Sequence, residues 1–204
     1  MTHERLHALT DGIFAIVMTL LVLELKVPVL DKPTNNSLWQ ALAENKAIFA
    51  SYLISFLLLF LYWRAHNFIV STMAKNVDIN LVNINILFLI LIGIVPFTTH
   101  LLGMYPQTQT AIIIYALNII LIGLALMIMR GYVEKSDTIE SDRRSPEQIL
   151  NARIRVLTPM VCAGLAIPLS FISTWLAFGL MMLGIGFNLL NNAAELFRKV
   201  FRIP

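Results

Sequence analysis

The chain has 204 residues, of which 58% are hydrophobic and only 13% are charged. Soluble domains keep roughly a quarter of their residues charged, so this composition argues against a soluble globular fold and indicates a surface that largely faces lipid. The net charge of +3 comes from basic residues that lie between long apolar runs. Because they form no continuous stripe, a nucleic-acid-binding surface is not expected.

Six apolar runs follow one another along the chain. A bilayer core about 30 Å thick needs roughly 20 helical residues per crossing. The sequence therefore predicts an all-α membrane protein in which one domain, residues 1–204, contains six transmembrane helices. The predicted spans are residues 5–27, 43–70, 79–102, 109–132, 151–169 and 172–197. The N-terminus carries Glu4 and Asp11 and shows no small-residue cleavage site, so a cleavable signal peptide is not expected.

Lysine and arginine are distributed unevenly between the predicted loops. Twelve of the 15 basic residues fall on one side of the six-helix topology, whereas Lys26, Lys32 and Lys46 fall on the other. Basic loops stay in the cytoplasm, so both termini are expected there. Adding or removing one helix would destroy this alternation, and the helix count and the orientation therefore support each other.

The first predicted helix carries an ionisable residue near each end. Only 12 residues separate Asp11 from Glu24, too few to cross the bilayer core without a charge. A charge at the centre of a span costs about 2.5–3.5 kcal/mol on insertion scales, so such residues usually face the bundle interior or water. The helix is therefore not expected to face lipid on all sides.

At about 100° per residue, one face of this helix is an aliphatic stripe. Its members are Leu9, Gly12, Ile16, Leu20, Leu23 and Val27. Thr19 and Glu24 flank the stripe on opposite sides, and Asp11 lies on the other face of the helix. The stripe could pack against neighbouring helices, or it could form a constriction that gates a pore by dewetting. Periodicity does not decide between these two interpretations.

Asp11 needs polar partners at its own depth in the membrane. The end of the second predicted helix and the start of the third both lie on the cytoplasmic side, and both carry polar residues. We expect a hydrogen-bonded cluster that fixes the first helix against these two, with a proton relay between His66 and Asp11 as the alternative. The predicted members are Thr10, Asp11, Trp63, His66 and Asn83, with Arg5 at the edge.

Pro96 interrupts the third predicted helix. Proline removes one backbone hydrogen bond and predicts a kink, and Thr98 or Thr99 could satisfy the freed groups. The kink is interpreted as a fixed packing bend, although a gating hinge would have the same sequence.

Several of these residues together resemble a known family. Arg5-Leu6-His7-Ala8-Leu9-Thr10-Asp11 resembles the R-x-x-x-F-S-D signature that opens the first helix of the transmembrane protein 175 potassium channels. Leu9 replaces the phenylalanine and Thr10 the serine. The run Tyr62-Trp63-Arg64-Ala65-His66, then Asn83, then Pro96-Phe97-Thr98 is similar to later landmarks of that family, in the same order.

The resemblance implies a potassium-selective channel of the single-repeat prokaryotic type, a homotetramer in the plasma membrane. It implies that the first helices line the pore, that Ile16, Leu20 and Leu23 form its constriction, and that Thr19 and Glu24 lie beside it. The permeant potassium ion would be the one ligand, with no cofactor or bound metal, and lipid and further copies of the chain would be the partners. Regularly spaced arginines are missing from every span, so a leak without a voltage sensor is expected.

Three other function classes were weighed. A secondary transporter would need inverted repeats and unwound helices, and Pro96 is the one hint of these. A non-conducting assembly subunit is compatible with the sequence. An enzyme is not expected, because the chain has neither an H-E-x-x-H motif nor a nucleophile with its base.

Overall fold

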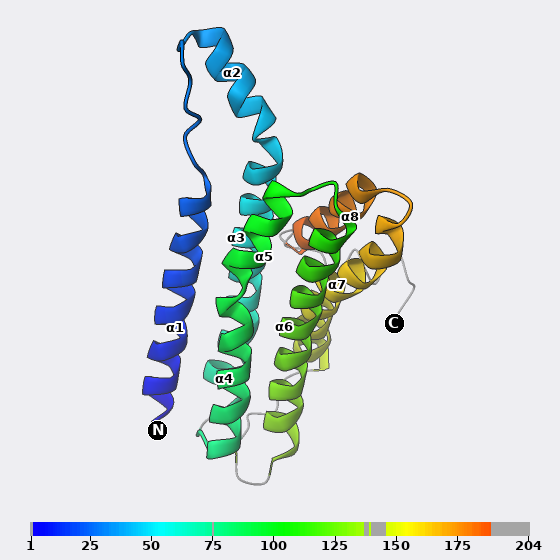
Figure 1. Cartoon of the computed structure of the whole chain (residues 1–204). Helices are drawn as coiled ribbons and strands as arrows, with labels where there is room; N and C mark the ends of the chain where they lie inside the picture. Colours follow the sequence, from blue (N-terminus) through cyan, green and yellow to red (C-terminus); the bar gives the residue numbers. More distant parts are fainter. Residues whose placement is uncertain (1, 75, 137–138, 140–145, 189–204) are drawn as a thin grey trace.

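The computed structural model describes residues 2–74, 76–136, 139 and 146–188, and these form a bundle of helices (Figure 1). Helix α1 spans His3–Leu20 and ends in a 3₁₀ turn, Leu21–Glu24. An extended segment leads to α2, Asn35–Glu44, where the side chains of Thr34 and Ser37 form a capping box at the start of the helix. Most of α2 lies between the first two predicted spans, 5–27 and 43–70, where no helix was predicted.

The remaining helices follow in chain order. They are α3 (Lys46–Asn67) with a π-helical turn (Phe68–Met73), α4 (Ile79–Gly93), α5 (Val95–Met104), α6 (Gln109–Lys135), α7 (Pro146–Ser170) and α8 (Thr174–Phe187).

Five helical segments of the described chain are long and apolar enough to cross a membrane. They are His3–Glu24, Lys46–Ser71, Ile79–Met104, Gln109–Lys135 and Leu150–Ser170. Helix α8 is apolar but shorter, and the predicted sixth span, 172–197, runs into residues outside the described part. The described residues therefore form an all-helical membrane protein, and the sixth crossing stays a prediction.

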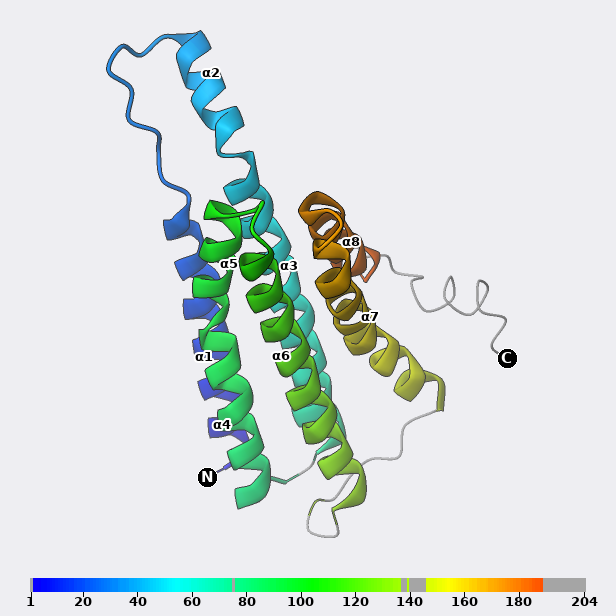
Figure 2. The ribbon, with the colours of Figure 1, turned by 45° about the vertical axis from the view of Figure 1, so that its right-hand side comes forward.

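The two ends of the bundle differ in charge. The start of α1, the start of α4 and the end of α6 lie at one end, and the turns that join α1 to α2 and α5 to α6 lie at the other (Figures 1 and 2). Among the described residues, six basic side chains lie toward the first end and three toward the second. The six are Arg5, Arg64, Arg130, Lys135, Arg153 and Arg155, and the three are Lys26, Lys32 and Lys46. Helix α2 projects beyond the other helices in both views.

Helix α1 stands at the edge of the subunit, whereas α6 is central (Figure 1). In its most apolar stretch 28% of the residues of α1 are buried, compared with 56% for α6. Polar contacts hold the central helices together, because Tyr115 of α6 and Thr99 of α5 both bond to the Ser55 hydroxyl of α3, at 2.9 and 2.7 Å. Buried hydroxyl groups paired in this way fix how the three helices pack.

The third predicted span is broken into α4 and α5 at Ile94, two residues before Pro96. The Asn118 amide of α6 donates to the Leu91 carbonyl at 3.1 Å, close to this break. The hydroxyl groups of Thr98 and Thr99 both donate to the Val95 carbonyl within α5. A neighbouring helix thus contributes to satisfying the backbone around the break, a role that the sequence had assigned to the threonines alone.

Candidate functional site

The aliphatic stripe of α1 points away from the rest of the subunit. The exposed fractions of Ile16, Leu20 and Leu23 are 59%, 42% and 67%. The opposite face packs against the rest of the subunit, because Phe14 and Leu21 are buried and the Phe14 ring lies 5.9 Å from the ring of Phe88 on α4. One half of the helix is therefore used inside the subunit, and the other half is left for lipid or another chain.

A second exposed stripe runs beside the first and consists of small side chains. Its members are Ala8, Gly12, Ala15 and Thr19. At about 100° per residue it lies roughly 80° around the helix from the aliphatic stripe. The Thr19 hydroxyl donates to the Ala15 and Ile16 carbonyls of its own helix at 3.0 and 2.8 Å, and the side chain is exposed on the surface of the subunit.

Asp11 joins α1 to α3 at the basic end of the bundle. Its Oδ1 accepts from the Trp63 indole N–H at 2.8 Å, and its Oδ2 lies 2.9 Å from Nδ1 of His7. The other ring nitrogen of His7 lies 2.9 Å from the Asn67 side-chain oxygen. The Asp11 side chain is 44% exposed, so water offsets part of the cost of its charge, which the sequence had suggested was buried.

A second polar chain lies next to the first and joins α1, α3 and α4. The His66 Nε2 lies 2.7 Å from the Asn85 side-chain oxygen, and the Asn85 amide donates to the Thr10 hydroxyl at 3.2 Å. That hydroxyl in turn donates to the Leu6 carbonyl at 3.0 Å. All three polar side chains are buried, so each depends on the others for its hydrogen bonds.

Two predicted members of the cluster lie elsewhere. Asn83 is exposed, and the buried position predicted for Asn83 is occupied by Asn85. Two residues along a helix correspond to a rotation of about 200°, which puts these two asparagines on opposite faces of α4. Arg5 is exposed on α1 and shares no hydrogen bond with the Asp11 or His66 chains described above. His7, for which no role was predicted, takes part instead.

Glu24 is held by a partner within the subunit. Its carboxylate lies 2.5 Å from Nδ1 of His100, which links the end of α1 to α5. No role was predicted for His100, because it has no partners at metal-binding spacing in the sequence. Nowhere in the described ranges do three histidine, cysteine, aspartate or glutamate side chains gather to hold a metal ion.

Comparisons with known proteins match this chain to one family. Residues 5–96 match the family described as the endosomal/lysosomal potassium channel TMEM175. A potassium channel of Streptomyces collinus is 32% identical over 191 residues, which cover 90% of this chain and 91% of the relative. A potassium channel of Chamaesiphon minutus is 33% identical over 198 residues, with 93% and 95% covered.

A solved structure shows the same fold. The crystal structure of a lysosomal potassium-selective channel TMEM175 homologue from Chamaesiphon minutus superposes with a TM-score of 0.75 at 28% identity, covering 91% of this chain and 95% of that one. The family resemblance carried by Arg5–Asp11 and the later landmarks is thereby confirmed. The chain belongs to the TMEM175 family of ion channels.

Proposed function

We propose that this protein is a potassium-selective channel in which copies of α1 surround a central axis. Two bacterial relatives that match over nine-tenths of the chain are potassium channels, and so is the homologue of known structure. The observation that carries the proposal is the division of α1 into a face packed within the subunit and a face of exposed aliphatic side chains.

A single α1 helix cannot enclose a pore, so symmetry-related copies must complete it. The stripe of Ala8, Gly12, Ala15 and Thr19 supports this arrangement, because small residues four apart allow two helices to approach closely in a membrane. If neighbouring copies of α1 pack along the small-residue stripe, the aliphatic stripe faces the central axis, because it lies roughly 80° away around the helix. The proposed assembly is a homotetramer.

In this assembly the exposed aliphatic side chains are the constriction. Ile16 forms the ring nearest the cytoplasm, and Leu20 and Leu23 form rings farther along the axis. Apolar rings of this kind control conduction by excluding water from the narrow part of a pore. Thr19 lies beside these rings as a polar group, and Glu24 is turned toward His100 of its own subunit, so it influences the outer mouth only as one half of an ion pair.

The channel is proposed to be a leak in a prokaryotic plasma membrane, with both termini in the cytoplasm. The sequence carries no regularly spaced arginines that could respond to voltage. The orientation follows from the uneven distribution of basic residues, because 12 of the 15 fall on the side of the predicted topology that carries Arg5 and Lys135.

Flux through purified protein in liposomes tests the proposal. Protein-loaded liposomes with a potassium gradient should carry potassium faster than sodium, and protein-free liposomes should carry neither. Saturable flux that requires a proton gradient would indicate a secondary transporter instead. A correctly folded preparation without flux would indicate an assembly subunit, and either result would refute the channel.

A further inference from the structure

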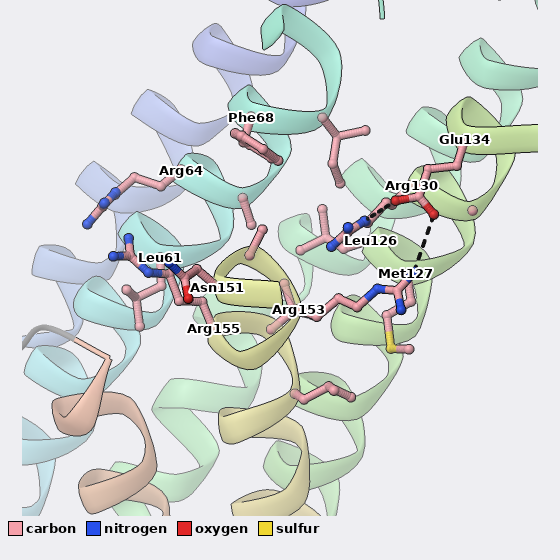
Figure 3. A pocket seen from close by; sticks show the side chains of 16 residues that line it. Leu61, Arg64, Phe68, Leu126, Met127, Arg130, Glu134, Asn151, Arg153 and Arg155 are labelled. Atoms are coloured by element: carbon pink, nitrogen blue, oxygen red, sulfur yellow. Dashed lines mark hydrogen bonds and ion pairs between the residues drawn. The ribbon is translucent and has the colours of Figure 1, made fainter. Parts of the chain in front are cut away.

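A cavity of about 520 Å³ lies between α3, α6 and α7, away from α1 (Figure 3). Its volume is within the usual range for sites that bind small molecules. The walls are formed mainly by apolar side chains from all three helices. Among them are Leu61, Phe68, Leu126, Met127 and Leu157. The proposed pore makes no use of this cavity.

Four arginines line the same cavity, and the one acidic residue among the described lining residues is Glu134. Glu134 accepts from the Arg130 Nε at 2.8 Å and lies 3.5 Å from an Arg153 nitrogen. Both ion pairs are drawn in Figure 3. Among the described lining residues, one carboxylate therefore stands beside four arginines, and Glu134 pairs with two of them.

Arg64 and Arg155 lie together on the other side of the cavity from Glu134 (Figure 3). The Arg64 guanidinium also lies over the Phe60 ring, 6.0 Å from its centroid, a contact that leaves the N–H groups at its edge to donate. Two neighbouring guanidinium groups repel each other, and an anion between them would remove that repulsion and accept hydrogen bonds from both.

These two arginines of the cavity lie near the ends of their membrane-spanning helices. Arg64 lies seven residues before the end of the Lys46–Ser71 span, and Arg155 lies five residues after the start of the Leu150–Ser170 span. Both positions are one to two helical turns inside the ends of their helices, on the end of the bundle proposed to be cytoplasmic. Basic pockets between helices at this depth suit the phosphate groups of anionic lipids.

Asn151 adds a polar group to the cavity wall. Its side-chain oxygen is buried and has no hydrogen-bond partner within the described ranges. A buried acceptor normally finds a donor, and a head-group hydroxyl can supply one.

We propose that this cavity binds an anionic phospholipid, with an acyl chain against the apolar wall and the phosphate on Arg64 and Arg155. The combination of an apolar cavity with an excess of arginine near the helix ends fits an amphiphilic anion. A neutral lipid would leave the charges without a partner, and a soluble phosphate would leave the apolar wall exposed. Binding of this lipid would couple α7 to α3 and α6.

Lipid binding to the purified full-length chain in detergent tests this proposal. The probes are phosphatidylglycerol and phosphatidylcholine with the same acyl chains, and the measurement is the dissociation constant from a thermal-shift titration. The variant Arg64→Gln/Arg155→Gln should bind phosphatidylglycerol roughly 30-fold more weakly, from the usual contribution of two basic residues. The control Lys26→Gln/Lys32→Gln removes the same charge at the opposite end and should bind as the unmodified chain does.

Equal weakening in the two double variants would mean that lipid responds only to net charge, and it would overturn the proposal. Unchanged binding by Arg64→Gln/Arg155→Gln would overturn it as well. If that variant does not fold, Arg64→Lys/Arg155→Lys keeps the charges and loses the paired N–H groups, and it should bind severalfold more weakly than the unmodified chain. Full-strength binding by the lysine variant would then refute the site.

A second variant tests the acyl chain separately. Ala65→Trp places a large side chain in the cavity while it keeps every arginine, so it should weaken phosphatidylglycerol binding at least tenfold. Inorganic phosphate at millimolar concentration should not displace the lipid from the unmodified chain. Displacement by inorganic phosphate, or full binding by Ala65→Trp, would indicate a site for the phosphate group alone and would contradict a lipid site.

Discussion

The two faces of α1 show how one helix can serve the subunit and the assembly. Phe14 and Leu21 are buried against neighbouring helices, whereas Ile16 and Leu23 on the other face are largely exposed. Exposure alone does not say what covers the second face, because Ile90 on α4 is 57% exposed and Ile16 is 59% exposed. The difference must therefore be tested by substitutions that affect stability on one face and conduction on the other.

The largest effect is expected on the packed face. Phe14→Ala removes a buried ring that contacts Phe88 and should lower the free energy of unfolding by roughly 3–5 kcal/mol. Chemical unfolding in detergent measures this change. A loss below about 1 kcal/mol, at the low end of ordinary substitutions, would mean that α1 is not fixed by this contact.

A smaller loss is expected at the polar end of the same face. Asp11→Ala removes the acceptor of the Trp63 N–H and the partner of His7, and it should cost about 1–3 kcal/mol of stability. The matched control is Asp31→Ala in the exposed segment before α2, which should be neutral within about 0.5 kcal/mol. Equal effects in the two variants would remove Asp11 from the helix-fixing role.

On the exposed face the expected effect is on conduction. Ile16→Asn should raise potassium flux on the order of tenfold, equivalent to a barrier lower by about 1.4 kcal/mol, and reduce discrimination against sodium. Liposome flux of both ions measures it. The matched control, Ile90→Asn, changes the same residue type at nearly the same exposure on α4 and should leave flux and selectivity unchanged. Identical behaviour of the two variants would place Ile16 against lipid.

The smallest effect is expected where α1 ends. Glu24→Gln weakens the pair that Glu24 forms with His100. The Glu24 side chain is 28% exposed and the His100 side chain 38%. Solvent screens such a pair, so the loss of stability should be about 0.5 kcal/mol or less. Potassium flux should change by less than about twofold, because a charge screened to this extent alters a barrier little. A large fall in flux would show instead that Glu24 acts directly on the ion at the outer mouth.

Helical periodicity was sufficient to define the two faces of α1. The 3.6-residue repeat groups Ile16, Leu20 and Leu23 without any knowledge of neighbours. It could not choose between lipid, a neighbouring helix and a pore, since an apolar side chain suits all three. The family resemblance supplied that choice, and it rests on motifs rather than on periodicity.

Contacts between helices were predicted less well. Asn83 and Asn85 are two residues apart, and the sequence does not show which of them faces the bundle. His7 could have been found, because its spacing of four residues from Asp11 is a same-face spacing on a helix. The Glu24–His100 pair and the arginine-lined cavity join distant segments, and no local sequence pattern predicts them.

A map of the purified assembly, at a resolution sufficient to separate helices, tests the central claim most directly. The account predicts four copies of the chain with their α1 helices next to the symmetry axis and the Ile16 side chains directed toward it. A map with α1 on the outer perimeter, surrounded by lipid or detergent, would contradict it.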